Sequence, residues 1–478
     1  MSGVPVVVVG AGPVGLTAAL LLARHGVGVL VLERQPGPYP LPRAVHLDDE
    51  VFRVLQAAGA ADEAAAISRP MAGLRILDGA RRVLASFERA AVPGRNGWPA
   101  GVLLHQPDLE AVLAAAVARS PLVTLQRGVE VVDLVQDDDG VTLTVLDGDV
   151  PRPVRARAVL GCDGANSTVR SLIGSVPRDL GPADRWLVLD ALSAAPLSAW
   201  GGVDQVCGPG RASTFMHVTG ARYRWEFRLA PGETAASLAE PEKLAALLAP
   251  VELAGLEIVR AVEYTFRASV SSMWRQGRVL LAGDAVHLTP PFVGQGLGLG
   301  LRDVHQLVWK LVAVLAGEPD SLLDTYQAER EPHARALIRV ALLLGRLMTG
   351  GGRGAAVVRR AVLTLVRRMP VVARLATESR TPPLRRGPLV ERRGRAGRLA
   401  GTLVPQPEVL VDGRPCRLDD VLGIGAAELR LGDGGLVVAT EDREVRIEDP
   451  SGLLSAWLRA AGATTVSIRP DRIVRSAS

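Results

Sequence analysis

Cysteine, lysine and aromatic residues are all scarce in this chain of 478 residues. Its three cysteines, Cys162, Cys207 and Cys416, form no CxxC pair, which excludes a disulfide framework or a zinc ribbon and favours a reducing cytoplasm without a metal site. Aromatic residues make up 4% of the chain, yet 48% is hydrophobic and 22% charged. This composition excludes a disordered or collagen-like chain and predicts a globular protein with a sizeable core.

The basic residues are almost all arginine, because only Lys243 and Lys310 among 55 basic residues are lysines. We attribute this to codon bias in a GC-rich genome. The formal net charge is only +5, which gives a weak field over this length and not a phosphate-binding stripe. We therefore expect no nucleic-acid partner.

Charged residues are absent from positions 1–23. A signal peptide or a membrane helix would fit this composition, but no basic segment precedes the apolar residues, and a secretory signal needs one. Gly10, Gly12, Pro13 and Gly15 also interrupt the stretch. We therefore expect neither a leader nor a membrane partner.

The same N-terminal residues match a dinucleotide-binding βαβ unit. Residues 4–9 predict a buried strand, GAGPVG (10–15) is a GxGxxG loop, a helical pattern follows, and a second strand over 27–32 ends in Glu33. The first glycine of such a loop permits a tight turn, the second lets the backbone approach a pyrophosphate, and the third allows close helix packing. The acid at the second strand's end can hold ribose hydroxyls. The motif alone does not separate FAD from NAD(P).

Two further segments indicate which cofactor is bound. DGANSTVR (163–170) follows a strand over 158–161, and GDAVHLTPPFVGQG (283–296) follows a strand over 278–282 and precedes a long apolar helix. Asp284 at its strand end can accept hydrogen bonds from sugar or ribityl hydroxyls. The positive N-terminal end of the long helix would stabilise negative charge on a reduced flavin ring.

With these three motifs in this order, the chain resembles the FAD-dependent aromatic hydroxylases, the para-hydroxybenzoate hydroxylase-like class of flavoprotein monooxygenases. The resemblance covers about residues 4 to 345. RAVHLDDE (43–50), GWP (97–99) and RWE (224–226) are most similar to the 3-(3-hydroxyphenyl)propionate hydroxylases and the actinobacterial polyketide hydroxylases. One departure is Gly298, where the family often has asparagine.

The resemblance implies an FAD site and a transient site for NAD(P)H as co-substrate. Arg43 would contact the pyrophosphate, Gln106 would face the ribityl chain, and Asp163 would organise a loop beside the flavin and the nicotinamide. The full set of cofactor-binding residues that it implies is Gly10, Gly12, Pro13, Gly15, Glu33, Arg34, Arg43, Gln106, Asp163, Asp284, Pro291, Gly294, Gln295, Gly296, Leu297 and Gly298.

The reaction implied by the resemblance is hydroxylation of a phenolic or polyketide aromatic substrate with NAD(P)H and O2, through a flavin C4a-hydroperoxide. Two alternatives stay open: Baeyer–Villiger oxidation on the same fold, and a non-catalytic flavin-binding redox regulator. A base that removes a phenolic proton is expected. His46, His217, His287 and Tyr223 are the candidates, although a structural role is the ordinary one for each histidine.

The predicted fold is α/β (α+β overall), in several units, and a homodimer is an open alternative to a monomer. Alternation over 223–229 predicts a strand of a second sheet, with Tyr223 and Trp225 on one face, where they could contact the substrate together with Pro291 and Phe292. The predicted units are a Rossmann-like FAD-binding domain (1–73, 100–178 and 270–345), a substrate-binding sheet domain (74–99 and 179–269) and a helical Arg-rich linker (346–398). For the C-terminal domain (399–478) the resemblance to the hydroxylase subgroup implies a thioredoxin-like fold.

Overall fold

The computed structural model describes most of the chain. The residues outside the description are 1–3, 42, 208–210, 250, 252–254, 351–353, 355–358, 360, 364–381, 385–386 and 433–434. Most of the predicted Arg-rich linker therefore lies outside the described residues. Among the described residues, no helix combines the length and the apolar character needed to cross a membrane.

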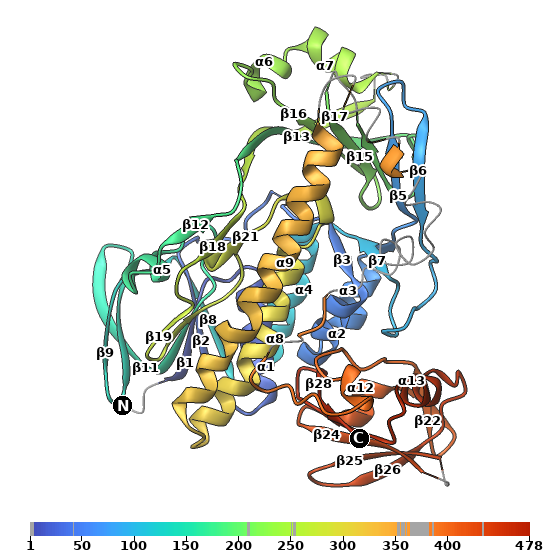
Figure 1. Cartoon of the computed structure of the whole chain (residues 1–478). Coiled ribbons are helices and arrows are strands. Elements are labelled where there is room, and N and C mark those ends of the chain that lie inside the picture. The colour runs from blue at the N-terminus through green and yellow to red at the C-terminus, as the bar shows by residue number, and fades with distance from the viewer. Residues whose placement is uncertain are drawn as a thin grey trace.

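An eight-stranded sheet forms the core of the N-terminal unit (Figure 1). Its central strands pair in parallel in the order β20-β11-β1-β2-β8, and β9 and β10 extend it through antiparallel pairs. Val6, Val7 and Val8 of β1 are fully buried, as expected for a parallel strand covered on both faces. The strands are β1 (Val4–Val9), β2 (Val29–Glu33), β8 (Val123–Arg127), β9 (Val129–Asp137), β10 (Gly140–Asp147), β11 (Val150–Gly161), β19 (Arg275–Gln276) and β20 (Val279–Leu281).

Helices cover this sheet and carry the chain to the other units. The predicted helix after GxGxxG and the long helix after GQG are both present, and they pack against each other. The second strand begins two residues later than the sequence predicts. The helices are α1 (Pro13–Arg24), α2 (Asp49–Ala58), α3 (Ala61–Ala66), α4 (Gln106–Arg119), α5 (Thr168–Leu172), α8 (Gly296–Leu315) and α9 (Asp324–Thr349), with short turns η3 (Asp320–Leu323) and η4 (Ala396–Arg398).

A second sheet of seven strands has the order β17-β13-β16-β15-β14-β5-β6. Segments far apart in the sequence meet in it, because β5 pairs in parallel with β14. Two short helices, α6 (Ala235–Leu238) and α7 (Pro241–Leu248), lie on its side turned away from α8 (Figure 1). The strands are β5 (Gly73–Leu77), β6 (Val83–Glu88), β13 (Asp184–Ser193), β14 (Val203–Val206), β15 (Ser213–His217), β16 (Arg222–Arg228) and β17 (Leu256–Phe266).

Two small three-stranded sheets connect the large ones. One has the order β3-β7-β4 and brings the segment after the second strand beside residues 101–103; the other, β12-β18-β21, leads from the second sheet back to the GDAVH motif. Their strands are β3 (His46–Asp48), β4 (Arg69–Pro70), β7 (Gly101–Leu103), β12 (Pro177–Asp179), β18 (Ser269–Ser271) and β21 (His287–Leu288).

The C-terminal unit has its own apolar core and is built on a five-stranded sheet, β26-β25-β24-β27-β28. All of its described pairs are antiparallel, whereas a thioredoxin-like fold is associated with a βαβ pattern, so that expectation is not confirmed. The elements are β22 (Glu408–Val411), β23 (Arg414–Arg417), α12 (Leu418–Leu422), β24 (Ala427–Gly432), β25 (Gly435–Thr440), β26 (Glu444–Ile447), α13 (Leu453–Ala461), β27 (Thr465–Ile468) and β28 (Val474–Ala477).

Buried charges join the C-terminal unit to the N-terminal one. Arg53 of α2 donates two hydrogen bonds to Asp419 of α12, at 2.8 and 2.7 Å, and a third to the Val404 carbonyl at 2.6 Å. His305 of α8 lies beside this pair, and burial lowers its pKa to about 4. The His305 imidazole at this junction is therefore neutral in the folded protein at neutral pH.

We expect His305 to make the folded state acid-sensitive. As pH falls from the usual histidine pKa of 6.5 to about 4, the unfolded chain binds a proton there and the folded chain does not, so stability is lost in that window. The loss attributable to this group is about 3 kcal/mol. A His305→Gln variant should lose less stability than the wild type between pH 7 and pH 4 in urea denaturation. An equal loss in both proteins would contradict this account.

Candidate functional site

The GxGxxG loop is shaped by two steric constraints. Gly10 has φ +103°, and a Cβ there would lie 2.5 Å from the carbonyl oxygen of Cys162, the residue after β11. A Cβ on Gly15 would lie 1.9 Å from the Gly10 carbonyl oxygen. Gly12 differs, because a Cβ there would meet no atom of the described residues within 4 Å. Gly12 is the N-cap of α1, no side chain of the described residues caps this helix, and Pro13 follows at its first position. The free N–H groups of the first turn can therefore bind an anion.

A cavity of 310 Å³ opens in front of this loop. Glu33 lies in its wall, and its carboxylate accepts hydrogen bonds from the backbone N–H of Ala11 at 2.8 Å and of Gln35 at 2.9 Å. A carboxylate can accept about four hydrogen bonds, so Glu33 orients the loop and keeps capacity for ribose hydroxyls. The predicted cofactor residues that line this cavity are Gly10, Gly12, Pro13, Glu33, Arg34, Arg43, Gln106 and Asp163.

Gln106 fixes the chain segment that closes the cavity. Its Oε1 accepts a hydrogen bond from the Ala44 N–H at 2.6 Å, and its Nε2 donates to Glu110 at 2.8 Å. The exposed guanidinium of neighbouring Arg43 lies over the Tyr39 ring, 4.8 Å from its centroid. Gln106 thus positions residues 43–46, and Arg43 presents its charge at the mouth of the cavity.

The second motif is a closed hydrogen-bonded loop that is tied to the third. The Asp163 carboxylate accepts from the Ser167 hydroxyl at 2.5 Å and from the Val169 N–H at 3.1 Å. Arg170 donates to the Ala285 carbonyl at 3.1 Å. Arg170 therefore holds the DGANSTVR and GDAVH segments together at one end of the first sheet.

Asp284 stands at the end of β20, in the turn η1 (Gly283–Ala285). Among the described residues no donor is bonded to its carboxylate, and burial raises its pKa, opposed by the charges of His287 and Arg43. A partly buried carboxylate without a donor is costly, so the position of Asp284 fits a ligand rich in hydroxyl groups. The glycine cradle, the open helix end and this carboxylate together fit FAD.

The PPFVGQG segment borders the same region. Its turn η2 (Pro291–Val293) ends at Gly294, whose φ is +61° and where a Cβ would lie 3.0 Å from Nδ1 of His46. Gln295 donates to Asp48 at 2.8 Å, so its side chain holds the loop and does not point into open space. A side chain at Gly298 would meet Arg302 and Val51. The backbone, including Gly296 and Leu297 at the start of α8, therefore forms this surface.

Two of the four base candidates lie near the motif loops. His46 of β3 has Nδ1 3.4 Å from the Gly294 carbonyl oxygen and Nε2 3.3 Å from the Arg89 guanidinium. Burial and Arg89 lower its pKa to about 4, so the ring is neutral near neutral pH. Since both nitrogens have partners, His46 is suited to holding the loop. His287 lies in the core, with Nε2 2.7 Å from Asp303. This burial and pairing suit a histidine that stabilises the fold.

The other two candidates lie on the outer face of the second sheet. Tyr223 is 3% exposed, accepts a hydrogen bond from the Leu197 N–H at 3.0 Å, and stacks on His217. Tyr223 and Trp225 belong to the apolar cluster beneath α6 and α7. The opposite face meets the PPFVGQG segment (290–296), which we call the flavin loop, since the rings of Trp186 and Phe292 are 5.9 Å apart. The alternation over 223–229 predicted both faces, but the sequence assigned no role to the face with Arg224 and Glu226.

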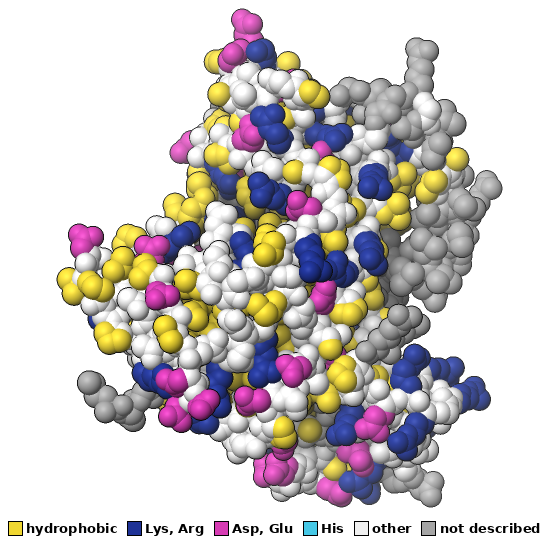
Figure 2. All heavy atoms as spheres, turned by 60° about the vertical axis from the view of Figure 1, so that its left-hand side comes forward, with side chains coloured by type: hydrophobic (Ala, Val, Ile, Leu, Met, Phe, Trp, Pro, Cys, Tyr) yellow, Lys and Arg dark blue, Asp and Glu magenta, His cyan; other side chains and the backbone are white. Residues whose placement is uncertain are grey.

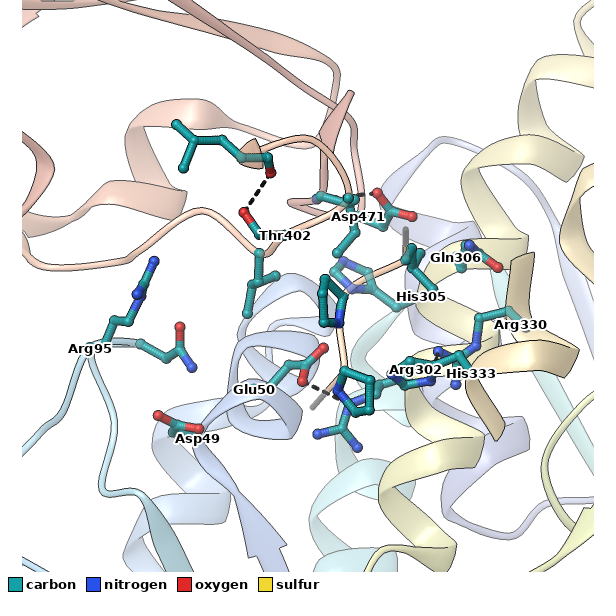
Figure 3. Close-up of a pocket in the computed structure, with 18 of the residues that line it drawn as sticks. Asp49, Glu50, Arg95, Arg302, His305, Gln306, Arg330, His333, Thr402 and Asp471 are labelled. Atoms are coloured by element: carbon teal, nitrogen blue, oxygen red, sulfur yellow. Dashed lines mark hydrogen bonds and ion pairs between the residues drawn. The ribbon is translucent and has the colours of Figure 1, made fainter. Parts of the chain in front are cut away.

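A second cavity, of 470 Å³, is a different space (Figure 3). It lies between α2, α8, α9 and the C-terminal unit. Asp49 and Arg302 point towards it from the helices, and Thr402 and Asp471 face it from the C-terminal unit. Burial and the charge of Asp48 raise the pKa of Asp49 to about 7. None of the predicted cofactor or substrate residues lines this cavity.

Comparison with known proteins identifies the protein family of this chain. Residues 3–341 match the family described as FAD binding domain. A probable NADH-specific resorcinol 4-hydroxylase of Rhodococcus jostii (strain RHA1) is 35% identical, over 98% of this chain and 91% of its own. A 3-(3-hydroxy-phenyl)propionate/3-hydroxycinnamic acid hydroxylase of Mycobacterium sp. (strain KMS) is 35% identical, over 99% and 88%. The structure of the anhydrotetracycline hydroxylase OxyS from Streptomyces rimosus matches with a TM-score of 0.77 and 26% identity, over 99% and 95%.

The chain belongs to this FAD-binding family. It is an enzyme, a flavin-dependent monooxygenase of the aromatic hydroxylase class, with relatives that span nearly its whole length. The resemblance seen in the sequence, the mixed α/β fold and FAD as cofactor are confirmed. The individual residues assigned to cofactor, substrate and catalysis stay predictions.

Proposed function

We propose that this enzyme uses NADH and O2 to hydroxylate a small phenolic compound. The observation that carries the proposal is the convergence of three distant segments, around Gly12, Asp163 and Asp284, on one cavity and the adjoining loop. The choice of NADH and of a one-ring phenol follows relatives named as resorcinol and hydroxyphenylpropionate hydroxylases. A polyketide substrate is the second candidate, supported by the match to the anhydrotetracycline hydroxylase.

In the proposed mechanism, the chain binds the cofactor and shields the reacting centre. Bound FAD supplies the electron transfer from NADH and the activation of O2. The first turn of α1 and Arg43 would hold the negatively charged pyrophosphate of FAD, and the Asp284 carboxylate would accept hydrogen bonds from its ribityl hydroxyls. The second sheet, anchored on Phe292 through Trp186, covers the ring site and excludes water.

The cellular compartment, the partners and the domain division of the enzyme are also part of this proposal. We place it in the cytoplasm because its three cysteines are free thiols, two of them buried. Arginine and acidic side chains are interspersed over the face in Figure 2, which supports the expectation of no nucleic-acid partner. The division into an FAD domain and a substrate domain that includes 74–99 and 179–269 is a proposal, and a homodimer stays a prediction.

The test begins with the purified protein. Denaturation should release about one FAD per chain, and a panel of phenols should stimulate NADH oxidation with formation of a product one oxygen atom heavier. NADPH serves as the matched control for the reductant. Ring-expanded ester products would favour Baeyer–Villiger oxidation. FAD release without any stimulation by phenols or polyketides would favour the non-catalytic regulator.

A further inference from the structure

The inner face of the second sheet, which is turned towards the flavin loop, carries a buried row of charges. On β16 and β13, Arg224 donates to Asp190 at 2.7 Å, and Arg260 of β17 lies 3.6 Å from the other oxygen of Asp190. Glu226 follows Arg224 on the same face. Two arginines and one aspartate are thus mutually paired, and Glu226 stands next in the row.

Two contacts place Glu226 over the ring site. On one side, Arg224 donates to the Arg43 carbonyl at 3.0 Å. On the other side, Trp186 touches Phe292 of the flavin loop. Glu226 is paired across the sheet with Val188, which lies between Trp186 and Asp190 on that face. The carboxylate therefore lies between the two points at which the sheet meets the FAD-binding loops.

Glu226 has no hydrogen-bond or salt-bridge partner among the described residues. Its side chain is nevertheless buried, with 9% of the residue exposed. Burial raises its pKa, and Arg224 opposes this shift. An acceptor that is buried without a donor costs free energy unless a ligand supplies the donor. The neighbouring carboxylate, Asp190, shows the contrast, because its donors come from the protein.

We propose that the Glu226 carboxylate accepts a hydrogen bond from a ring hydroxyl of the substrate, and that it selects uncharged hydroxyarenes over aromatic carboxylates. This inference rests on the proposed function and deepens it. A hydroxyl donor satisfies the carboxylate, whereas a substrate carboxylate brings a second negative charge close to it in a buried site. Glu226 is thus a specificity-determining residue, distinct from the groups that hold FAD.

The experiment compares resorcinol, which is uncharged, with 3-(3-hydroxyphenyl)propionate, which carries a carboxylate. The wild type should prefer resorcinol in kcat/KM for stimulated NADH oxidation. Glu226→Gln should lower kcat/KM for resorcinol by roughly 10- to 100-fold, as for loss of a charge-assisted hydrogen bond, and should bind the propionate more tightly. Dissociation constants come from the change in flavin absorbance, which needs no turnover.

The ratio of the two kcat/KM values is the decisive readout, because damaged folding lowers both. Glu263→Gln is the matched control, since Glu263 lies on the outer face of the same sheet, paired with exposed Arg185, and its ratio should equal that of the wild type. An unchanged ratio in Glu226→Gln overturns the proposal. If that variant does not fold, Glu226→Asp is the second test, because it keeps the charge on a shorter side chain. Weaker binding of resorcinol, with the propionate still bound poorly, supports the proposal. Unchanged binding of resorcinol overturns it.

Failure of the proposed function would look different. It would appear in the wild type, as NADH oxidation that neither compound nor any other phenol stimulates. A wild type that hydroxylates phenols but prefers the propionate would leave the proposed function intact and overturn the role of Glu226.

Discussion

A Gly12→Ala variant is expected to fold like the wild type and to bind FAD roughly 10- to 100-fold more weakly. The φ of Gly12 is −73°, which alanine adopts freely, and in the described part of the chain no atom lies within 4 Å of an added Cβ. The same methyl group would project into the cavity where the pyrophosphate approaches the backbone, and overpacking of this kind costs about 1–3 kcal/mol. FAD content after gel filtration and a fluorescence titration of the apoprotein measure the effect.

Gly15→Ala should instead lower the stability of the folded protein. Its Cβ would overlap the Gly10 carbonyl oxygen at 1.9 Å, so the backbone of the loop must shift and the folded state itself is destabilised. Gly425→Ala is the control, because that glycine lies in the C-terminal unit and a Cβ there also meets none of the described atoms within 4 Å. If Gly12→Ala lowered the unfolding midpoint of the apoprotein as much as Gly15→Ala, the separate roles assigned to the two glycines would be wrong.

These glycines show which part of the site the sequence predicts well. The turn at Gly10 and the packing at Gly15 depend on residues within one short βαβ unit, so local pattern and local geometry coincide. The Asp163–Ser167 bond is equally local. The Arg170–Ala285 bond spans 115 positions, and only the joint occurrence of the two motifs pointed to it.

The second sheet shows where pattern analysis stops. Alternation along β16 separated Tyr223 and Trp225 from Arg224 and Glu226, but it contains no information on which face meets the FAD unit. That choice depends on α6 and α7, which cover the aromatic face and leave the charged face inside. A charged row on a strand ordinarily predicts a solvated face, so the buried row of this sheet could not be predicted. Strand direction in the antiparallel C-terminal sheet is likewise set by tertiary contacts, so the sequence does not predict it.

The second large effect is expected at Glu329, which joins three parts of the chain. Its two oxygens bond Lys310 of α8 at 2.9 Å and Arg469 of the C-terminal unit at 2.9 Å, and Gln306 donates at 2.7 Å. All of these side chains are buried, and burial lowers the pKa of Lys310 to about 8. Removal of the Glu329 charge leaves Lys310 buried without its partner, whereas Arg469 keeps its ion pair with Asp471. Breaking a buried ion pair in this way costs about 3–5 kcal/mol.

Glu329→Gln should therefore lower the free energy of unfolding by about 3–5 kcal/mol and expose the junction of the C-terminal unit to proteolysis. Urea denaturation and limited trypsin digestion measure the two effects. Glu331→Gln on the same helix is the matched control: its partner Arg335 lies one turn away and both side chains are partly exposed, so its cost should stay below about 1 kcal/mol. Equal losses in the two variants would show that the buried position of Glu329 contributes nothing special, because the same charge is removed from the same helix in both.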